Sequence, residues 1–236
     1  MARERGGIWI AIGVGILYPA SLLLGRKKTL GLEHLPSSGG ALIVLNHVSH
    51  LDGPLDAVTI NRQGRVPRFL VKAGVWKNPV VGRILTGLGQ VPVHRGTTKA
   101  ADSMKAAVAA LEAGRTVVVY PEGTITKDPE GWPMAARTGI ARIALATGVP
   151  VIPAARWGTR EILDHYHKTF RPLPRKTVTT RFGEPVDLTG YRGRPVTAAL
   201  LREVTELSMD RVTGLLAEIR DERPPAARIR PEDSQE

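Results

Sequence analysis

The chain has 236 residues, about one and a half times a typical domain of ~150 residues, which favours one domain with an appendage. It contains no cysteine, so disulfides, thiolate metal sites and a cysteine nucleophile are excluded. Lys and Arg outnumber Asp and Glu by 33 to 22, and the net charge of +11 favours an anionic partner such as nucleic acid, anionic lipid or a phosphorylated small molecule.

An uncharged apolar stretch runs from Gly6 to Gly25. A continuous helix of about 20 residues reaches ~30 Å, the thickness of a hydrocarbon core, although Pro19 predicts a kink. Basic residues flank both ends: Arg3, Arg5, Arg26, Lys27 and Lys28. A signal peptide and a buried helix are the alternatives. We expect a membrane-associating segment over residues 1–28, at the cytoplasmic membrane, and the larger number of basic residues after the stretch favours the following chain on the cytoplasmic side.

Short apolar runs, typical of strands that are buried on both faces, recur along the rest of the chain. They are Ala41–Leu45, Arg68–Val71, Gln90–Val93, Thr116–Tyr120 and Val149–Ala155, with a more exposed candidate at Thr177–Phe182. Helical patterns lie between and after them, at Thr97–Ala113, Gly139–Thr147 and Val196–Ile219. This alternation predicts an α/β fold with a mixed, largely parallel central sheet flanked by helices. We expect one domain over residues 29–222 and a flexible tail, rich in proline and charge, over 223–236.

A block of polar residues follows the predicted strand at 41–45 directly and contains Asn46, His47, Ser49 and Asp52. A histidine can take a proton from a hydroxyl, and a carboxylate on its other ring nitrogen fixes the tautomer. On one continuous helix, His47 and Asp52 would point ~140° apart. They meet only if His47 lies in a loop and Asp52 in the first helical turn, and the Ser-x-x-Asp capping pattern favours such a helix start.

Three other interpretations of this block remain open. Ser49 and Asp52 can serve only as helix caps, with His47 a buried and satisfied histidine. A metal site would use His47, His50 and Asp52, but no second cluster of ligand residues follows in the sequence. A serine hydrolase would need a Gly-x-Ser-x-Gly turn around Ser49, which the flanking residues do not provide.

A second block follows the predicted strand at 116–120 and reads Pro121, Glu122, Gly123 and Thr124. Proline and glycine are typical of a simple turn. The block can also deliver a carboxylate and backbone amides to the edge of the sheet, where sites in α/β folds usually lie.

Together, the Asn-His-x-x-x-x-Asp and Tyr-Pro-Glu-Gly-Thr blocks resemble the glycerolipid acyltransferase family, whose bacterial members include 1-acyl-glycerol-3-phosphate acyltransferases. The segment from Lys72 to Arg95 resembles a second block of the family, and Val149–Pro153 resembles a fourth. The resemblance covers roughly Leu30–Ala155 in four ordered motifs.

The resemblance implies that His47 is the general base and that Asp52 orients it. The acyl group would pass from acyl-CoA or acyl carrier protein to the free hydroxyl of 1-acyl-glycerol-3-phosphate and give phosphatidate, without an acyl-enzyme, a metal or another cofactor. Asn46 and Ser49 would support the loop and the developing oxyanion. The basic charge suits both an anionic donor and an anionic membrane surface.

The resemblance also implies an acceptor site, with one departure from the family pattern. Its candidate residues are Lys72, Arg95, Glu122, Gly123, Thr124, Lys127 and Arg137. The family's third block usually continues with an arginine that contacts phosphate, but this chain has Ile125 there. Either Lys127 or Arg137 replaces that arginine, or the acceptor is another lysophospholipid or a glycolipid; both side chains can also be plain surface charges.

Two non-enzymatic functions are weaker alternatives. A non-catalytic lipid-binding protein would not need the intact pair of His47 and Asp52. A nucleic-acid binder is disfavoured because the sequence has no recognised binding motif and only 5% aromatic residues.

Overall fold

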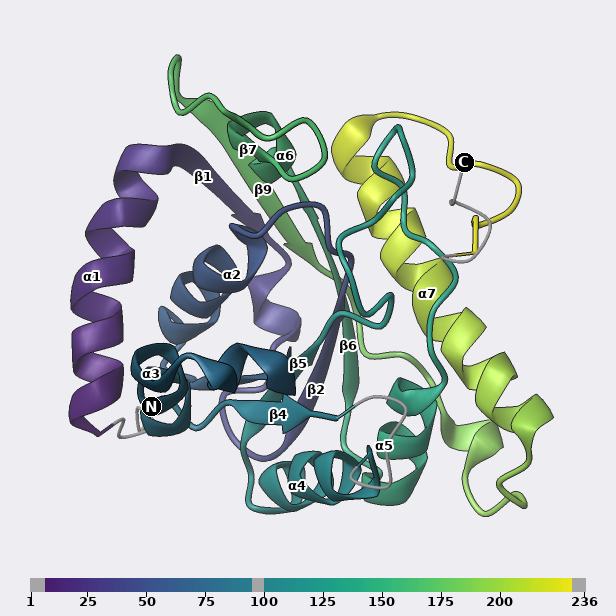
Figure 1. Cartoon of the computed structure of the whole chain (residues 1–236). Coiled ribbons are helices and arrows are strands. Elements are labelled where there is room, and N and C mark those ends of the chain that lie inside the picture. Colours follow the sequence, from purple (N-terminus) through teal and green to yellow (C-terminus); the bar gives the residue numbers. More distant parts are fainter. Residues whose placement is uncertain (1–6, 95–99, 231–236) are drawn as a thin grey trace.

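The computed structural model describes residues 7–94 and 100–230 and is built around a seven-stranded sheet (Figure 1). The strands follow the order β1-β9-β6-β2-β5-β3-β4. Their bounds are β1 Gly25–Leu30, β2 Ala41–Leu45, β3 Pro67–Lys72, β4 Val91–Val93, β5 Thr116–Val119, β6 Val151–Trp157 and β9 Lys176–Phe182. Every neighbouring pair is parallel except β6 with β9. The predicted mixed, largely parallel sheet is therefore confirmed.

Helices cover both faces of the sheet (Figure 1). The α-helices are α1 Ile8–Leu24, α2 Asp52–Asn61, α3 Pro79–Gly87, α4 Ala100–Glu112, α5 Gly139–Thr147, α6 Thr159–Ile162 and α7 Ala198–Arg220. Short 3-10 turns form at η1 Leu32–His34, η2 Ala73–Lys77 and η3 Thr189–Tyr191, and a separate two-stranded ribbon joins β7 Leu163–Asp164 to β8 Thr169–Phe170. Helices α1, α2 and α3 lie on one side of the sheet, and α4, α5 and α7 lie on the other.

Strand β2 is apolar at every position because both of its faces are buried. Leu42 and Val44 pack into the core formed with α4, α5 and α7. Ala41, Ile43 and Leu45 pack into the opposite core, which includes Ile60 of α2. Because both faces of a largely parallel sheet are covered, no position of this strand is left for a polar side chain. The first polar residue, Asn46, comes where the strand ends.

Most predicted elements are found with the same bounds or bounds shifted by one or two residues. The runs at Ala41–Leu45 and Gly139–Thr147 match β2 and α5 without change. Gly148 ends α5 in the left-handed conformation with φ of 62°, and Gly114 has φ of 73° just after α4, as expected for helix ends. The predicted start of α4 at Thr97 lies outside the described residues.

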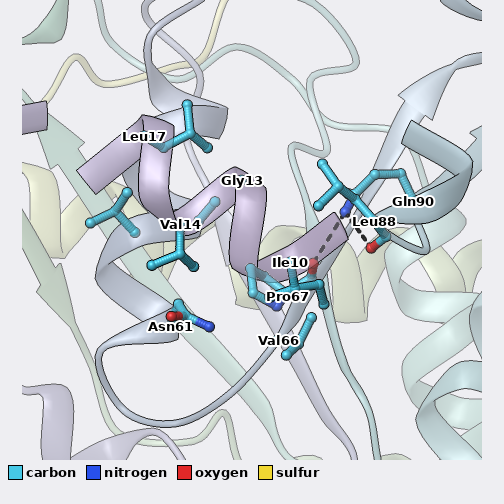
Figure 2. A pocket seen from close by; sticks show the side chains of 11 residues that line it. Ile10, Gly13, Val14, Leu17, Asn61, Val66, Pro67, Leu88 and Gln90 are labelled. Carbon is cyan, nitrogen blue, oxygen red and sulfur yellow. Dashed lines mark hydrogen bonds between the residues drawn. The ribbon is translucent and has the colours of Figure 1, made fainter. Parts of the chain in front are cut away.

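The apolar amino-terminal stretch forms α1, and one face of this helix packs on the domain. Across the part of the chain that the structure describes, no helix is both long and apolar enough to cross a membrane. A hollow of about 60 Å³ lies between α1 and the rest of the domain. Ile10, Val14 and Leu17 of α1 and Asn61 of α2 line it (Figure 2). The opposite face of α1 leaves apolar side chains exposed: Ile8, Ile12, Ile16, Leu22 and Leu23. Association with a membrane stays a prediction.

The carboxyl-terminal segment is partly fixed, whereas the sequence predicted a flexible tail over 223–236. Residues 223–230 contain no helix or strand, yet Arg228 pairs with Glu206 and Asp210 of α7. The carbonyl of Ile229 also accepts the amide of Ala135 at 2.8 Å. The proline-rich and charged composition of this segment does not indicate these contacts. Residues 231–236 lie outside the described chain.

Candidate active site

His47 and Asp52 meet at the edge of the sheet where β2 ends. His47 lies in the loop after β2, and Asp52 is the first residue of α2. Nδ1 of His47 lies 2.9 Å from Oδ2 of Asp52, with the histidine side chain 17% exposed and the aspartate fully buried. The break between loop and helix that the five-residue spacing required is therefore confirmed. No partner of the second ring nitrogen, Nε2, is found within the described chain.

The buried carboxylate of Asp52 has four hydrogen-bond partners. Oδ2 also accepts the amides of Val48 at 2.7 Å and Ser49 at 2.8 Å, and Oδ1 accepts the hydroxyl of Thr159 at 2.5 Å. Burial alone would raise the pKa of Asp52, but the hydrogen bond and charge of His47 and the Thr159 hydroxyl hold that pKa below its ordinary value. Asp52 therefore stays ionised and can fix the orientation of His47.

Asn46 and Ser49 support the loop. The side chain of Asn46 exchanges two hydrogen bonds with the backbone of Arg156 on β6, at 3.0 and 2.8 Å. The hydroxyl of Ser49 donates to the carbonyl of Leu163 at 2.7 Å. Only half of the predicted capping box forms, because the Asp52 carboxylate accepts the Ser49 amide, while Leu51 is the residue before the helix and provides no side-chain cap. These bonds tie the loop to β6 and β7, and the bonded Ser49 amide is not free to hold an oxyanion.

Glu122 is a buried link between two loops. One of its oxygens accepts the backbone amide of His47 at 3.0 Å, and the other accepts the amide of Met134 at 2.9 Å. Burial raises the pKa of Glu122 to about 7, opposed by these two bonds. The sequence indicates Glu122 as part of the acceptor floor, but Glu122 does not line the hollow beside His47, because both of its oxygens accept main-chain amides.

A hollow of about 370 Å³ opens beside His47. Gly123 and Thr124 line it, as predicted, together with Lys72 at the carboxyl end of β3. Because β2, β3, β5 and β6 are parallel, their carboxyl ends bring these residues to one edge of the sheet. Ile125 lines the same hollow, and its carbonyl accepts the Tyr166 hydroxyl at 2.8 Å.

The other predicted phosphate-binding candidates are not gathered at this hollow. Arg137 is exposed and lines a neighbouring hollow of about 280 Å³, which shares Leu70, Tyr120 and Gly123 with the first. Lys127 lines neither hollow. Arg95 lies outside the described residues.

Two histidines meet at the rim of the hollow without further ligand groups. Nε2 of His50 lies 3.0 Å from Nδ1 of His165 on the β7–β8 ribbon. In the described ranges, no group of three or more His, Cys, Asp or Glu side chains is arranged to hold a metal ion.

Sequence reasoning missed four residues that build this site. Asp56 and Arg156 form a buried ion pair beneath it, Thr159 binds Asp52, and Tyr166 holds the loop at Ile125. One signal was available, because Arg156 and Thr159 are polar residues at and just after the end of a buried strand. Their partners lie 100 and 107 positions away, so spacing alone did not identify the contacts.

A known protein family matches the part of the chain that carries this site. The model of the family described as Acyltransferase matches residues 27–157, which is more than half of the chain and includes every site residue up to Arg156. The chain belongs to this family. The catalytic-domain resemblance inferred from the four motifs is thereby confirmed.

Relatives of this acyltransferase family member include proteins named 1-acyl-sn-glycerol-3-phosphate acyltransferase. A chloroplastic 1-acyl-sn-glycerol-3-phosphate acyltransferase of Brassica napus is 32% identical over 158 residues, which cover 66% of this chain and 42% of that protein. A 1-acyl-sn-glycerol-3-phosphate acyltransferase of Borreliella burgdorferi is 25% identical over 142 residues, covering 59% of this chain and 55% of that protein. The aligned region thus spans less than two thirds of either relative.

A solved structure shares the fold of this family member over most of its length. The 1-acyl-sn-glycerophosphate acyltransferase PlsC of Thermotoga maritima matches with a TM-score of 0.71 and 25% identity, covering 92% of this chain and 81% of that one. The α/β sheet with its covering helices is therefore a shared architecture.

Proposed function

We propose that the chain transfers a fatty acyl group from acyl-CoA or acyl carrier protein to the free hydroxyl of 1-acyl-glycerol-3-phosphate, giving phosphatidate. The observation that carries this proposal is the contact of His47 with the buried, ionised Asp52 at the edge of a hollow large enough for a reacting ester group. The names of the relatives support the same reaction.

In the proposed reaction, His47 acts as general base. Asp52 holds Nδ1, so Nε2 accepts the proton of the acceptor hydroxyl as its oxygen bonds to the thioester carbonyl carbon. The tetrahedral intermediate collapses by breaking the carbon–sulfur bond. The proton then passes from His47 to the departing thiolate. A thiol of pKa about 8.5 leaves far more readily than an alkoxide, so little acid assistance is needed and no acyl-enzyme forms.

The acceptor headgroup would lie over Gly123 and Thr124, with the Lys72 ammonium as its cation. A second candidate function is favoured by Ile125, which is 4% exposed and presents an apolar side chain where the family's arginine would contact phosphate. An isoleucine cannot form a charge-assisted phosphate contact. Acylation of a different lysophospholipid or of a glycolipid therefore stays the alternative.

We also propose that the chain works at the cytoplasmic face of the cytoplasmic membrane, with α1 lying against anionic lipid. The support is the exposed apolar face of α1 together with the basic residues Arg26 and Lys28 that follow it and are exposed. Apolar area buried in the acyl boundary and attraction of cations to anionic lipids add to one another.

The test is acyl transfer by the purified full chain with radiolabelled palmitoyl-CoA. The acceptors are lysophosphatidate, glycerol-3-phosphate, a neutral lysophospholipid and lysophosphatidylinositol. Each is tested with the wild type, with His47→Ala and with His34→Ala, a control at a half-buried histidine that does not line the hollow. Phosphatidate from lysophosphatidate is the expected product. Transfer only to another acceptor favours the second candidate. If neither palmitoyl-CoA nor palmitoyl-acyl carrier protein gives transfer to any acceptor, the proposed function is wrong.

A further inference from the structure

The ring of His47 is held from its face as well as from its edge. The rings of His47 and Tyr120 lie 4.3 Å apart between centroids and 15° from parallel. Phe69 continues this arrangement, with its ring centroid 6.1 Å from that of Tyr120 and 19° from parallel. A single hydrogen bond at Nδ1 leaves the imidazole free to tilt around the bond, and a stacked ring removes this freedom.

Tyr120 is itself fixed by a buried carboxylate. Its hydroxyl donates to Oδ2 of Asp56 at 2.6 Å. Burial and the charge of Asp56 raise the pKa of Tyr120 well above its ordinary value, so the hydroxyl keeps its proton and remains a donor. Without this hydroxyl, that oxygen of the buried Asp56 carboxylate would lose its partner.

Arg156 completes the group on the other oxygen of Asp56. Its Nε donates to Oδ1 at 2.7 Å and its Nη2 donates to the same atom, and both side chains are nearly inaccessible, at 1% and 2% exposure. Asp56 lies one helical turn after Asp52 on α2, so both carboxylates share one face of the helix. The guanidinium compensates two buried negative charges that would otherwise repel each other.

We propose that Tyr120, Asp56 and Arg156 form a buried support that fixes the plane of the His47 ring for catalysis. Tyr120 is a positioning residue that acts on His47 through the stacked ring. Asp56 acts through the Tyr120 hydroxyl, and Arg156 acts through Asp56 and through its backbone bonds to Asn46. The inference rests on the proposed role of His47 as base.

Kinetics of substituted full-length proteins test this support. Tyr120→Phe keeps the ring but not the hydroxyl, and we expect kcat to fall about fivefold with KM unchanged, whereas Tyr120→Leu, which loses the ring, lowers kcat about a hundredfold. Asp56→Asn and the double variant Tyr120→Phe/Asp56→Asn complete a double-mutant cycle. The fall in kcat of the double variant should equal the larger of the two single falls, because Asp56 acts on His47 through Tyr120. Tyr191→Phe is the matched control and should keep the wild-type kcat.

The outcomes separate this inference from the proposed function. Wild-type kcat in folded Tyr120→Leu, or multiplicative losses in the cycle, would overturn the support while leaving His47 as the base. If Asp56→Asn does not fold, the Tyr120 variants decide alone. NMR tests the support even if the preparation is inactive. The ring-proton resonances of His47, assigned by their loss in His47→Ala, should shift in Tyr120→Phe and keep their positions in Tyr191→Phe. Resonances that stay in place in Tyr120→Phe and in Tyr120→Leu would contradict the inference.

Discussion

Oδ2 of Asp52 lies 2.9 Å from Nδ1 of His47 and, at the same time, accepts the amides of Val48 and Ser49. One carboxylate oxygen thus holds both the imidazole and the backbone of the loop that carries it. The orientation of the ring and the shape of the loop are therefore coupled, and a change at Asp52 affects both.

Asp52→Asn tests this coupling. The amide lacks the charge that stabilises an imidazolium and offers a single acceptor oxygen to four donors, so we expect kcat to fall by about a thousandfold or more. The fold should also lose stability, because a buried amide replaces a satisfied carboxylate. The measurement is kcat per folded protein, with Asp102→Asn on the exposed face of α4 as the control. A loss smaller than tenfold would contradict the orienting role of Asp52.

Thr159→Val removes the hydroxyl that binds Oδ1 of Asp52 at 2.5 Å and keeps the side-chain shape. The buried oxygen is left unpaired, so the free energy of unfolding should fall by about 1–3 kcal/mol. The pKa of Asp52 should rise, because this hydroxyl is one of the groups that lower it. Urea unfolding measures this loss of stability. Thr147→Val is the control, because it removes a part-buried hydrogen bond from the Thr147 hydroxyl to the carbonyl of Ile143 in the same helix. Equal stabilities of the two variants would argue against the Asp52 contact.

The pH dependence of stability should report Glu122. Its pKa is raised from 4.5 to about 7 in the folded chain, so the folded state binds more protons between these values. Its contribution is present below about pH 4.5 and is lost as the pH rises through about 7, by at most about 3 kcal/mol. Glu122→Gln cannot titrate and should flatten this part of the profile.

Urea midpoints of the wild type and of Glu122→Gln at pH 5 and pH 7.5 check this prediction, with Glu112→Gln on α4 as a control. Glu122→Gln should also be less stable at both pH values, because its NH₂ group must face one of two amide donors. A profile with the same slope in both proteins would assign the titration to another group.

Much of the fold follows from local patterns, because each strand and helix carries its own signal. β2 is apolar on both faces, and α5 runs into Gly148, whose positive φ ends the helix. The contact of His47 with Asp52 is also local, since it needs only a loop followed by a helix start. These features do not depend on how the strands are ordered.

The rest of the site depends on strand order and could not be read from spacing. Arg156 reaches Asp56 and Asn46 only because β6 pairs with β2 in the sheet. Glu122 binds main-chain amides, which no side-chain motif reveals. The anchoring of the chain near Arg228 depends on the acidic face that α7 presents after folding.

The exposed face of α1 leads to a prediction for lipid binding. Ile12→Glu and Ile16→Glu place charges on the outer face, away from the packed side of the helix, so the fold should persist. Binding to vesicles that contain anionic phospholipid should fall by about tenfold or more in the double variant. The measurement is vesicle co-sedimentation, with Val196→Glu, an exposed apolar residue before α7, as the control. Unchanged binding by the double variant would place the lipid contact elsewhere.

The role of His47 as general base is tested most directly by the rate of acyl transfer by His47→Ala beside His34→Ala, with folding of both checked by circular dichroism. His47 has its ring held by Asp52 and lines the hollow, whereas His34 lies in η1, away from it. We predict that folded His47→Ala loses transfer by about ten thousandfold and that His34→Ala keeps the wild-type rate. Near-normal turnover by folded His47→Ala would show that His47 is not the general base.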